Sequence, residues 1–154
     1  DRGRLDEADQ WYRQSLAISE DLGIRAYLAS TYHQLGITAQ VRGRLDEADQ
    51  WYRQSLAIKE DLGNRPGLGL TYAQMALLAE EQGQDHEALN WAVRSVSLFS
   101  EVPHPSTGTA PAHLARLATR LGIAAVQESW QEITGGPLPQ AVRDYITKQQ
   151  DPAP

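Results

Sequence analysis

The sequence has 154 residues, enough to bury an ordinary single-domain core, and its 41% hydrophobic and 22% charged residues are the balance of a soluble folded protein. No stretch approaches the ~20 apolar residues of a membrane-spanning helix, so we expect no membrane partner. The formal net charge of −6 disfavours a nucleic-acid partner, because a phosphate backbone would meet a repulsive average field. The absence of cysteine excludes disulfides and thiolate sites and is typical of a reducing cytosol, so we expect a cytoplasmic location.

A repeat with a period of 40 residues dominates the chain. RGRLDEADQWYRQSLAI occurs at residues 2–18 and again, unchanged, at 42–58. The same period relates the glycines Gly3, Gly43 and Gly83, the serines Ser15, Ser55 and Ser95, and the tryptophans Trp11, Trp51 and Trp91. A fixed period of this size predicts a solenoid, and recurrent tryptophans favour packing between helices over a ligand cage. Residues expected to face solvent, such as Gln50 and Arg53, are also the same in both copies. Packing does not require this, so it indicates that the segment was duplicated recently.

The repeated segment predicts an amphipathic helix. One apolar stripe has helical spacing and consists of Leu45, Ala48, Tyr52, Ser55 and Leu56, and an adjoining stripe consists of Trp51, Ile58 and Leu62. So broad an apolar surface predicts a helix packed between two neighbours. Asp46 and Glu47 suit its first turn, and Gly23 and Gly63 suit its end in the two copies.

Residues 28–40 and 68–80 predict the other helix of each pair. Small residues at Gly36, Ala39, Ala76 and Ala79 would let a neighbouring backbone approach closely. Pro66 suits a first helical turn, and Gly43 and Gly83 suit the tight turn within a pair.

The period breaks after Phe99, and the chain therefore divides into four parts. We predict repeats over residues 1–100, with copies near 1–23, 24–63 and 64–100, and a Pro-rich connection over 101–112. A degenerate helical pair and a capping helix follow over 113–149, and a frayed tail over 150–154.

The pattern Tyr32-x2-Leu35-Gly36-x2-Ala39 followed by Ala48-x3-Tyr52 resembles the tetratricopeptide repeat. The resemblance implies an all-α fold, a right-handed superhelical solenoid of antiparallel helix pairs with a concave face that binds peptides or partner domains. No catalytic residue, cofactor or metal comes with it, so we expect no enzyme. The period of 40 residues exceeds the usual length of about 34. This longer variety is similar to repeats in kinesin light chains and in bacterial multidomain signalling proteins.

The start of the sequence at Asp1, inside a repeat, leads us to expect a piece of a longer protein. We therefore expect a protein-binding scaffold that forms the C-terminal recognition or regulatory part of a bacterial signalling protein. The alternative is a structural module that self-associates. The first helix, 4–22, lacks a preceding partner, so Leu5, Tyr12 and Leu16 should lose cover and form a sticky surface.

Residue types that carry catalysis or bind metals do not form a known pattern. None of His33, His86, His104 and His113 lies at i, i+4 from another, and we expect His104 and His113 to be exposed loop and helix-start residues. The recurring serines occupy packing positions without a G-x-S-x-G turn. Adjacent carboxylates such as Glu80 and Glu81 point about 100° apart on a helix and cannot share a site.

A partner surface is predicted on the first helix of each pair. Its outward positions are Ser30, His33, Ile37 and Gln40 in one copy and Leu70, Ala73, Leu77 and Glu80 in the next. The residues at these positions differ between the two copies, whereas residues 42–58 are identical to residues 2–18. The Lys, Asn and Arg clamp for a terminal carboxylate, known in this family, is not present at them. We therefore expect an apolar, hydrogen-bonding groove for a helical or extended segment.

Overall fold

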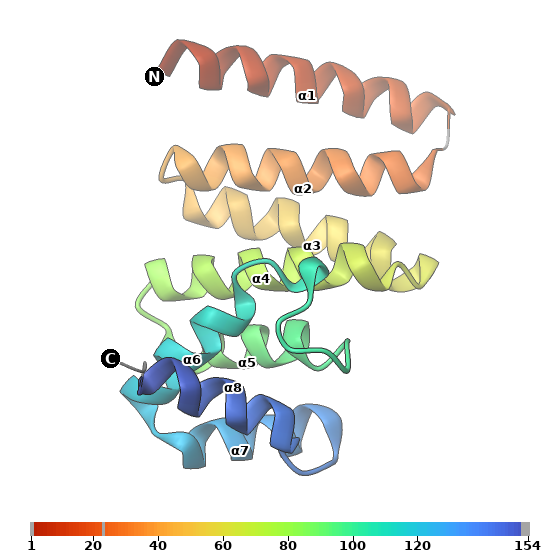
Figure 1. Cartoon of the computed structure of the whole chain (residues 1–154). Helices are drawn as coiled ribbons and strands as arrows, with labels where there is room; N and C mark the ends of the chain where they lie inside the picture. Colours follow the sequence, from red (N-terminus) through yellow and green to blue (C-terminus); the bar gives the residue numbers. More distant parts are fainter. Residues whose placement is uncertain (1, 23, 152–154) are drawn as a thin grey trace. The chain divides into compact units, whose positions relative to one another are not determined.

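A computed structural model describes residues 2–22 and 24–151. These residues form eight α-helices and one 3₁₀ turn and contain no strand, so the predicted all-α class is confirmed (Figure 1). The chain divides into two compact units, residues 1–71 and 72–154, and the boundary falls inside one helix. Gly23, predicted to end the first helix, and residues 152–154 of the predicted tail lie outside the described residues.

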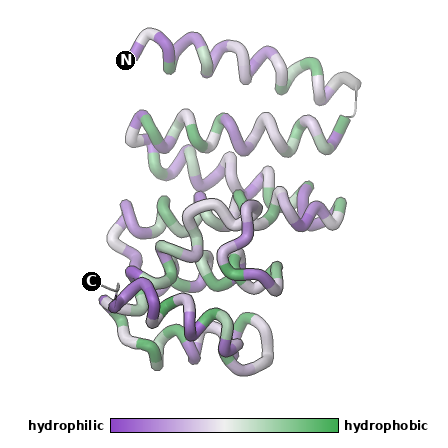
Figure 2. Tube along the Cα trace, viewed as in Figure 1, coloured by the Kyte–Doolittle hydropathy of each residue, from purple (hydrophilic) through white to green (hydrophobic). Residues whose placement is uncertain are grey.

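The first unit contains α1 (Arg2–Leu22), α2 (Arg25–Val41), α3 (Leu45–Leu62) and the start of α4 (Arg65–Glu81). Successive helices α1, α2 and α3 run antiparallel and side by side (Figure 1), and α2 packs against both of its neighbours. The predicted helix pairs are confirmed, although α2 and α4 begin at 25 and 65 rather than at 28 and 68. Hydrophobic and hydrophilic residues alternate along these helices, as expected for amphipathic helices packed in a stack (Figure 2).

A glycine ends α3 where the sequence predicts. Gly63 caps α3 with a φ of 64°, a left-handed conformation that residues with a Cβ rarely adopt. The following backbone N–H, of Asn64, donates to the carbonyl of Lys59 at 2.9 Å and so satisfies a carbonyl at the end of the helix. Pro66 lies in the first turn of α4, and Asp46 and Glu47 lie in the first turn of α3, as predicted.

The interface between α2 and α3 depends on a close approach at Gly36. A Cβ on this residue would lie 2.5 Å from a ring carbon of Tyr52, which is fully buried. The Tyr52 hydroxyl donates to Oε1 of Gln40 at 2.6 Å, and Tyr32 stacks on Trp51 with ring centroids 5.5 Å apart. The predicted packing role of the small residue at 36 is therefore confirmed.

The predicted stripes of α3 are largely confirmed. Ala48, Tyr52, Ser55 and Leu56 are buried, and Trp51 and Ile58 are half-buried. Leu62 corrects the prediction, because it is 46% exposed. As the last residue of the helix, it lies where the chain turns away and no neighbour covers it.

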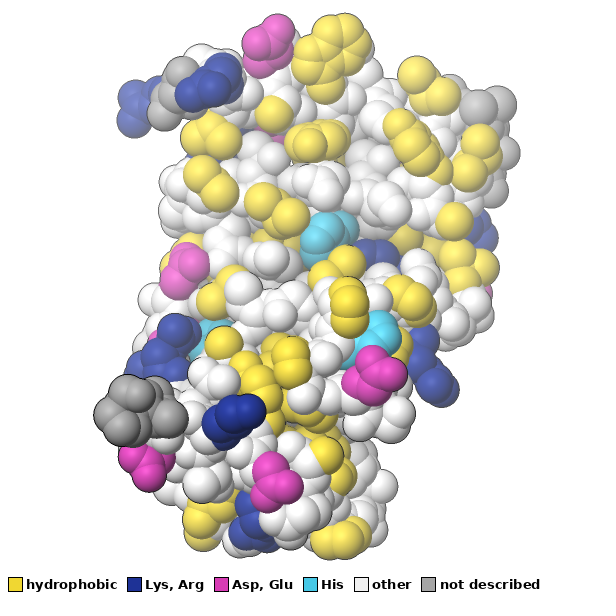
Figure 3. Space-filling model, viewed as in Figure 1, with side chains coloured by type: hydrophobic (Ala, Val, Ile, Leu, Met, Phe, Trp, Pro, Cys, Tyr) yellow, Lys and Arg dark blue, Asp and Glu magenta, His cyan; other side chains and the backbone are white. Residues whose placement is uncertain are grey.

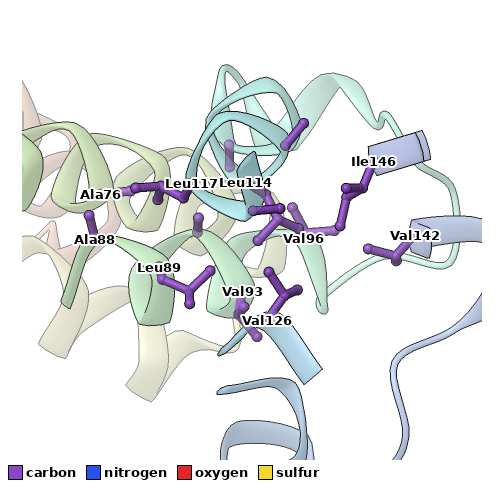
Figure 4. Close-up of a cluster of buried hydrophobic side chains, with 14 of the residues drawn as sticks. Ala76, Ala88, Leu89, Val93, Val96, Leu114, Leu117, Val126, Val142 and Ile146 are labelled. Carbon is purple, nitrogen blue, oxygen red and sulfur yellow. The ribbon is translucent and has the colours of Figure 1, made fainter. Parts of the chain in front are cut away.

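The second unit contains the rest of α4 with α5 (Asp85–Val96), α6 (Ala110–Leu121), α7 (Ile123–Thr134) and α8 (Gln140–Gln150). Here α6 packs against α5, α7 and α8. Their apolar side chains meet in one cluster (Figure 4), which includes Leu89, Val93, Leu114, Leu117, Val126, Val142 and Ile146. The closing helix α8 begins directly after Pro139, which is its N-cap residue.

The connection between α5 and α6 is ordered by its own side chains. The ring of Phe99 stacks on His104 with centroids 3.9 Å apart, and Nδ1 of His104 accepts a hydrogen bond from the backbone N–H of Ser106 at 3.0 Å. A 3₁₀ turn follows over Pro105–Thr107. Helix α6 then begins at Ala110, inside the segment predicted as the connection, because Pro111 fits its first turn.

Candidate functional site

Four of the predicted partner-binding residues lie on α2, in the first unit. Ser30 is exposed, and His33, Ile37 and Gln40 are half-buried. Gln40 is occupied by its hydrogen bond from Tyr52 and thus contributes to the packing between α2 and α3. Ser30, His33 and Ile37 are the members of this group with side chains left for a ligand.

The other four lie on α4. Leu70, in the first unit, is 43% exposed, and Leu77, in the second unit, is half-buried. Ala73 is only 2% exposed and belongs to the hydrophobic cluster of the second unit. Glu80 is paired with side chains of α6. Leu70 and Leu77 therefore offer apolar surface, whereas Ala73 offers almost none.

A polar cluster joins three helices of the first unit. Nζ of Lys59 on α3 donates to Oγ1 of Thr71 on α4 at 2.8 Å, and Nδ1 of His33 on α2 lies 2.9 Å from the same oxygen. The Thr71 hydroxyl itself donates to the carbonyl of Gly67 at 3.1 Å. Because the hydroxyl proton of Thr71 is used in the bond to Gly67, the Thr71 oxygen accepts a hydrogen bond from Lys59. It also accepts one from His33 in the tautomer that carries hydrogen on Nδ1.

The cluster contains a buried cation without a counter-ion. Lys59 is only 5% exposed, and no carboxylate of the described residues raises its pKa against the effect of burial. Burial lowers the pKa of Lys59 to about 8. Burial and, second, the positive charge of Lys59 lower the pKa of His33 to about 4. At neutral pH the cluster therefore presents a largely protonated amine beside a neutral imidazole.

The sequence prediction does not include Lys59, although a signal for it exists. Residues 2–23 and 42–63 differ at this position alone, where the first copy has Ser19. Ser19 is also buried, and its hydroxyl donates to the carbonyl of Ser15 one turn earlier at 2.9 Å. A serine thus satisfies itself locally, whereas the lysine reaches a neighbouring helix. The two segments therefore differ only by a change from serine to a cation, and this difference is the sequence signal for Lys59.

A second polar cluster ties α4 to α6 within the second unit. Glu80 accepts hydrogen bonds from Arg116 at 2.7 Å and from Arg120 at 3.0 Å, and Nε2 of His113 lies against its carboxylate. Burial opposes the charge of Glu80, but the two arginines and His113 together lower its pKa to about 2. Glu80 thus secures α6 in addition to its predicted place on the partner surface.

The burial of His113 corrects the prediction of an exposed helix-start residue. It is 2% exposed although it lies in the first turn of α6, because it faces Glu80 of α4. Burial lowers the pKa of His113, and the nearby carboxylate opposes that effect. Nδ1 of His113 has no hydrogen-bond partner among the described residues.

Ser55 and the glycines of α4 have structural places among the described residues. Residues 2–22 and 24–151 contain no group of three His, Asp or Glu side chains that could hold a metal ion. Ser55 is buried, and its hydroxyl donates to the carbonyl of Ala29 at 2.7 Å. Gly67 and Gly69 lie inside α4, not in a loop that could hold a phosphate. No helix within the described ranges is both long and apolar enough to cross a bilayer.

Comparison with known families adds evidence that is independent of this geometry. A profile of the tetratricopeptide repeat family matches residues 1–61 and 27–101, which cover α1 to α5. No curated protein matches the chain.

Proposed function

Because the chain belongs to the tetratricopeptide repeat family, whose repeats generally mediate protein–protein interactions, we propose that it binds a peptide segment of a partner protein. The binding side chains are those of Ser30, His33 and Ile37 on α2 and of Leu70 on α4, all in the first unit. The predicted Leu77 lies in the second unit and stays a separate candidate. Gln40, Ala73 and Glu80, predicted at the same register, support these helices through their own contacts. The chain acts as a scaffold and carries out no catalysis.

The observation that carries this proposal is the buried Lys59 beside His33. An uncompensated ammonium group costs free energy when it is withdrawn from water, and a ligand acceptor would offset that cost. His33 directs Nδ1 to Thr71, which leaves Nε2 for the ligand. Apolar Ile37 lies one turn along α2. The ligand is therefore a helical or extended segment that places a carbonyl or carboxylate near Lys59 and an apolar side chain near Ile37.

Sequence differences between the copies support the same surface. His33 and Ile37 correspond to Ala73 and Leu77, whereas residues 42–58 repeat 2–18 without change. Between the same two copies the stacked pair of Tyr32 and Trp51 is retained as Tyr72 and Trp91, whereas these positions vary. Variation of this kind is expected where a surface is adapted to a ligand.

The wider setting follows from the long repeat. We assign the 40-residue period to the variety found in kinesin light chains and bacterial signalling proteins. In this proposal the chain is the C-terminal recognition or regulatory module of a larger cytoplasmic signalling protein. The sequence of the complete gene tests it: an adjoining switch or effector domain supports the proposal, and a continuation made of unrelated structural repeats contradicts it.

Peptides selected from a random library test the binding surface directly. Selected peptides should bind the wild-type chain and lose at least tenfold in affinity for a variant carrying Ile37→Asp and Leu70→Asp, both in the first unit. Ile123→Asp, an exposed apolar position on α7, serves as the matched control. Circular dichroism establishes that each variant keeps its helical content. Equal affinity for the wild-type chain and the double variant would show that peptides bind elsewhere.

Self-association is the second candidate function, and exposed apolar residues on α1 favour it. Trp11 is 64% and Ile18 is 59% exposed, and predicted Leu5, Tyr12 and Leu16 are half-buried. Light scattering over a hundredfold range of concentration measures this directly. A mass that rises with concentration, and does not do so for Trp11→Ala, supports assembly, and a constant monomer mass contradicts it.

A further inference from the structure

A depression in the second unit lies between α5 and α7, away from the helices α2 and α4 that carry the proposed peptide surface. Its volume is about 230 Å³. Its lining consists of His86, Leu89 and Asn90 of α5 and of Ala125, Glu128, Ser129 and Glu132 of α7. The two helices belong to the same compact unit and pack directly against each other. The depression is therefore formed within one unit.

The floor of the depression combines apolar surface with a hydrogen-bonding group. Leu89 and Ser129 are 1% and 4% exposed, and Ala125 is half-buried. The Ser129 hydroxyl donates to Oδ1 of Asn90 at 2.6 Å, a bond that joins α7 to α5. Because this bond uses the only hydrogen of the hydroxyl, the Ser129 oxygen keeps lone pairs that can accept from a ligand. The floor thus offers an aliphatic contact and an acceptor.

The rim of the depression is acidic and is not neutralised. Glu128 and Glu132 are exposed and one turn apart on α7, and their carboxylates form no ion pair within the described part of the chain. None of the lining residues is Lys or Arg. Elsewhere in this unit opposite charges meet: Asp85 accepts from Arg120 at 2.9 Å, and acidic and basic side chains are interspersed over the face of the unit seen in Figure 3. The depression therefore attracts a cation.

The first unit shows what lies between the corresponding helices α1 and α3, which are also the second helices of successive pairs. Arg13 of α1 donates to Asp9 on its own helix at 2.9 Å and to Glu47 of α3 at 3.3 Å, so one guanidinium joins two carboxylates. In the 40-residue period, Asp9 and Arg13 correspond to Leu89 and Val93. Helix α5 therefore has apolar residues where α1 has an ion pair, although α7 presents two carboxylates.

We propose that the depression between α5 and α7 binds the side chain of an arginine supplied by a partner protein. The guanidinium donates to the carboxylates of Glu128 and Glu132 and to the Ser129 oxygen, and the aliphatic stem packs on the apolar floor. A guanidinium suits the site better than an ammonium group, because its donors lie in one plane and reach two carboxylates at once, as those of Arg13 do. The partner segment is basic.

N-acetyl-L-arginine amide is the direct probe, because its blocked ends leave the guanidinium as its only charge. In an NMR titration of the isotope-labelled chain, it should shift the amide resonances of residues 86–90 and 125–132 saturably. The matched lysine derivative should bind at least threefold more weakly. A variant carrying Glu128→Gln and Glu132→Gln should lose at least tenfold in affinity for the arginine derivative. Glu101→Gln, at an exposed carboxylate of the same unit, is the control and should leave binding unchanged.

The outcomes separate this site from the peptide surface, because the resonances that report it belong to α5 and α7. Circular dichroism establishes that each variant keeps its helical content. Absence of saturable shifts over these helices, or equal affinity for the wild-type chain and the double variant, would overturn the proposal. Equal affinity for the lysine derivative would overturn the choice of a guanidinium. Tighter binding of free arginine than of the blocked amide would assign the site to the amino acid instead of to a partner's side chain.

Discussion

Nζ of Lys59 donates a hydrogen bond of 2.8 Å to Oγ1 of Thr71, and this hydroxyl is its one bonded partner in the described part of the chain. The other copy of the repeat shows that a serine satisfies the same buried position. A protein that keeps a costly charge where a small residue suffices uses that charge for something other than folding. The proposed recognition of a ligand acceptor accounts for it.

Lys59→Met should make the protein more stable. Between about pH 8 and pH 10.5 the unfolded chain binds more protons at Lys59 than the folded chain does, so the free energy of unfolding rises with pH in that window. At pH 7 the free energy of unfolding of the variant should be about 2 kcal/mol higher than that of the wild type. The variant should also lack the increase of this free energy with pH. Urea denaturation across the window measures both effects. Lys148→Met, at an exposed lysine of α8, is the control, and an unchanged pH slope in Lys59→Met would contradict the prediction.

His33→Ala should remove an acid sensitivity. The folded pKa of about 4 lies below the ordinary value of 6.5, so the unfolded chain binds more protons between these values and stability falls as pH falls through them. The wild type should lose about 2 kcal/mol from this group between pH 7 and pH 4, allowing for partial exposure. The variant has alanine at this position, as the next repeat does at Ala73. Its free energy of unfolding should fall less over this pH range. His86→Ala, at an exposed histidine, should behave as the wild type does.

Gly36→Ala should be strongly destabilising although it adds one methyl group. The new Cβ would lie 2.5 Å from the Tyr52 ring, which is fully buried and cannot withdraw without disturbing the interface of α2 and α3. We expect a loss of about 2 kcal/mol or more by thermal or urea unfolding. Gly136→Ala is the control, because its nearest neighbour atom would be 3.9 Å away. Equal stability of the two variants would show that the helices can separate freely at Gly36.

Glu80→Gln should loosen α6. The pKa of Glu80, lowered to about 2, means that its contribution to stability is present above pH 4.5 and is lost as pH falls toward 2. The variant should lose about 2 kcal/mol at neutral pH and show faster amide exchange in α6, because Arg116 and Arg120 lose their shared carboxylate. Glu132→Gln, exposed on α7, should change neither. Unaltered exchange in α6 would mean that apolar packing alone holds this helix.

The period, the helix pairs and the packing stripe could be predicted from the order of residues alone. Ala48, Tyr52 and Leu56 are buried as predicted because the spacing of apolar residues along a helix is a local property. Gly63 ends its helix as predicted because its left-handed conformation depends on the residue itself and not on distant contacts. The place of Gly36 over a large side chain follows from the same periodicity.

Which positions are buried, and which residues cover them, depends on contacts between helices. His113 is buried against Glu80 because α6 packs there, and no local pattern distinguishes that histidine from an exposed one. Lys59 becomes a polar centre only because Thr71 comes from a different helix. Trp11 and Trp51 make the point most directly, since each lies in the same sequence of residues, yet one is exposed and the other is half-buried. Burial depends on the neighbouring helix, and a segment's own sequence does not contain its neighbour.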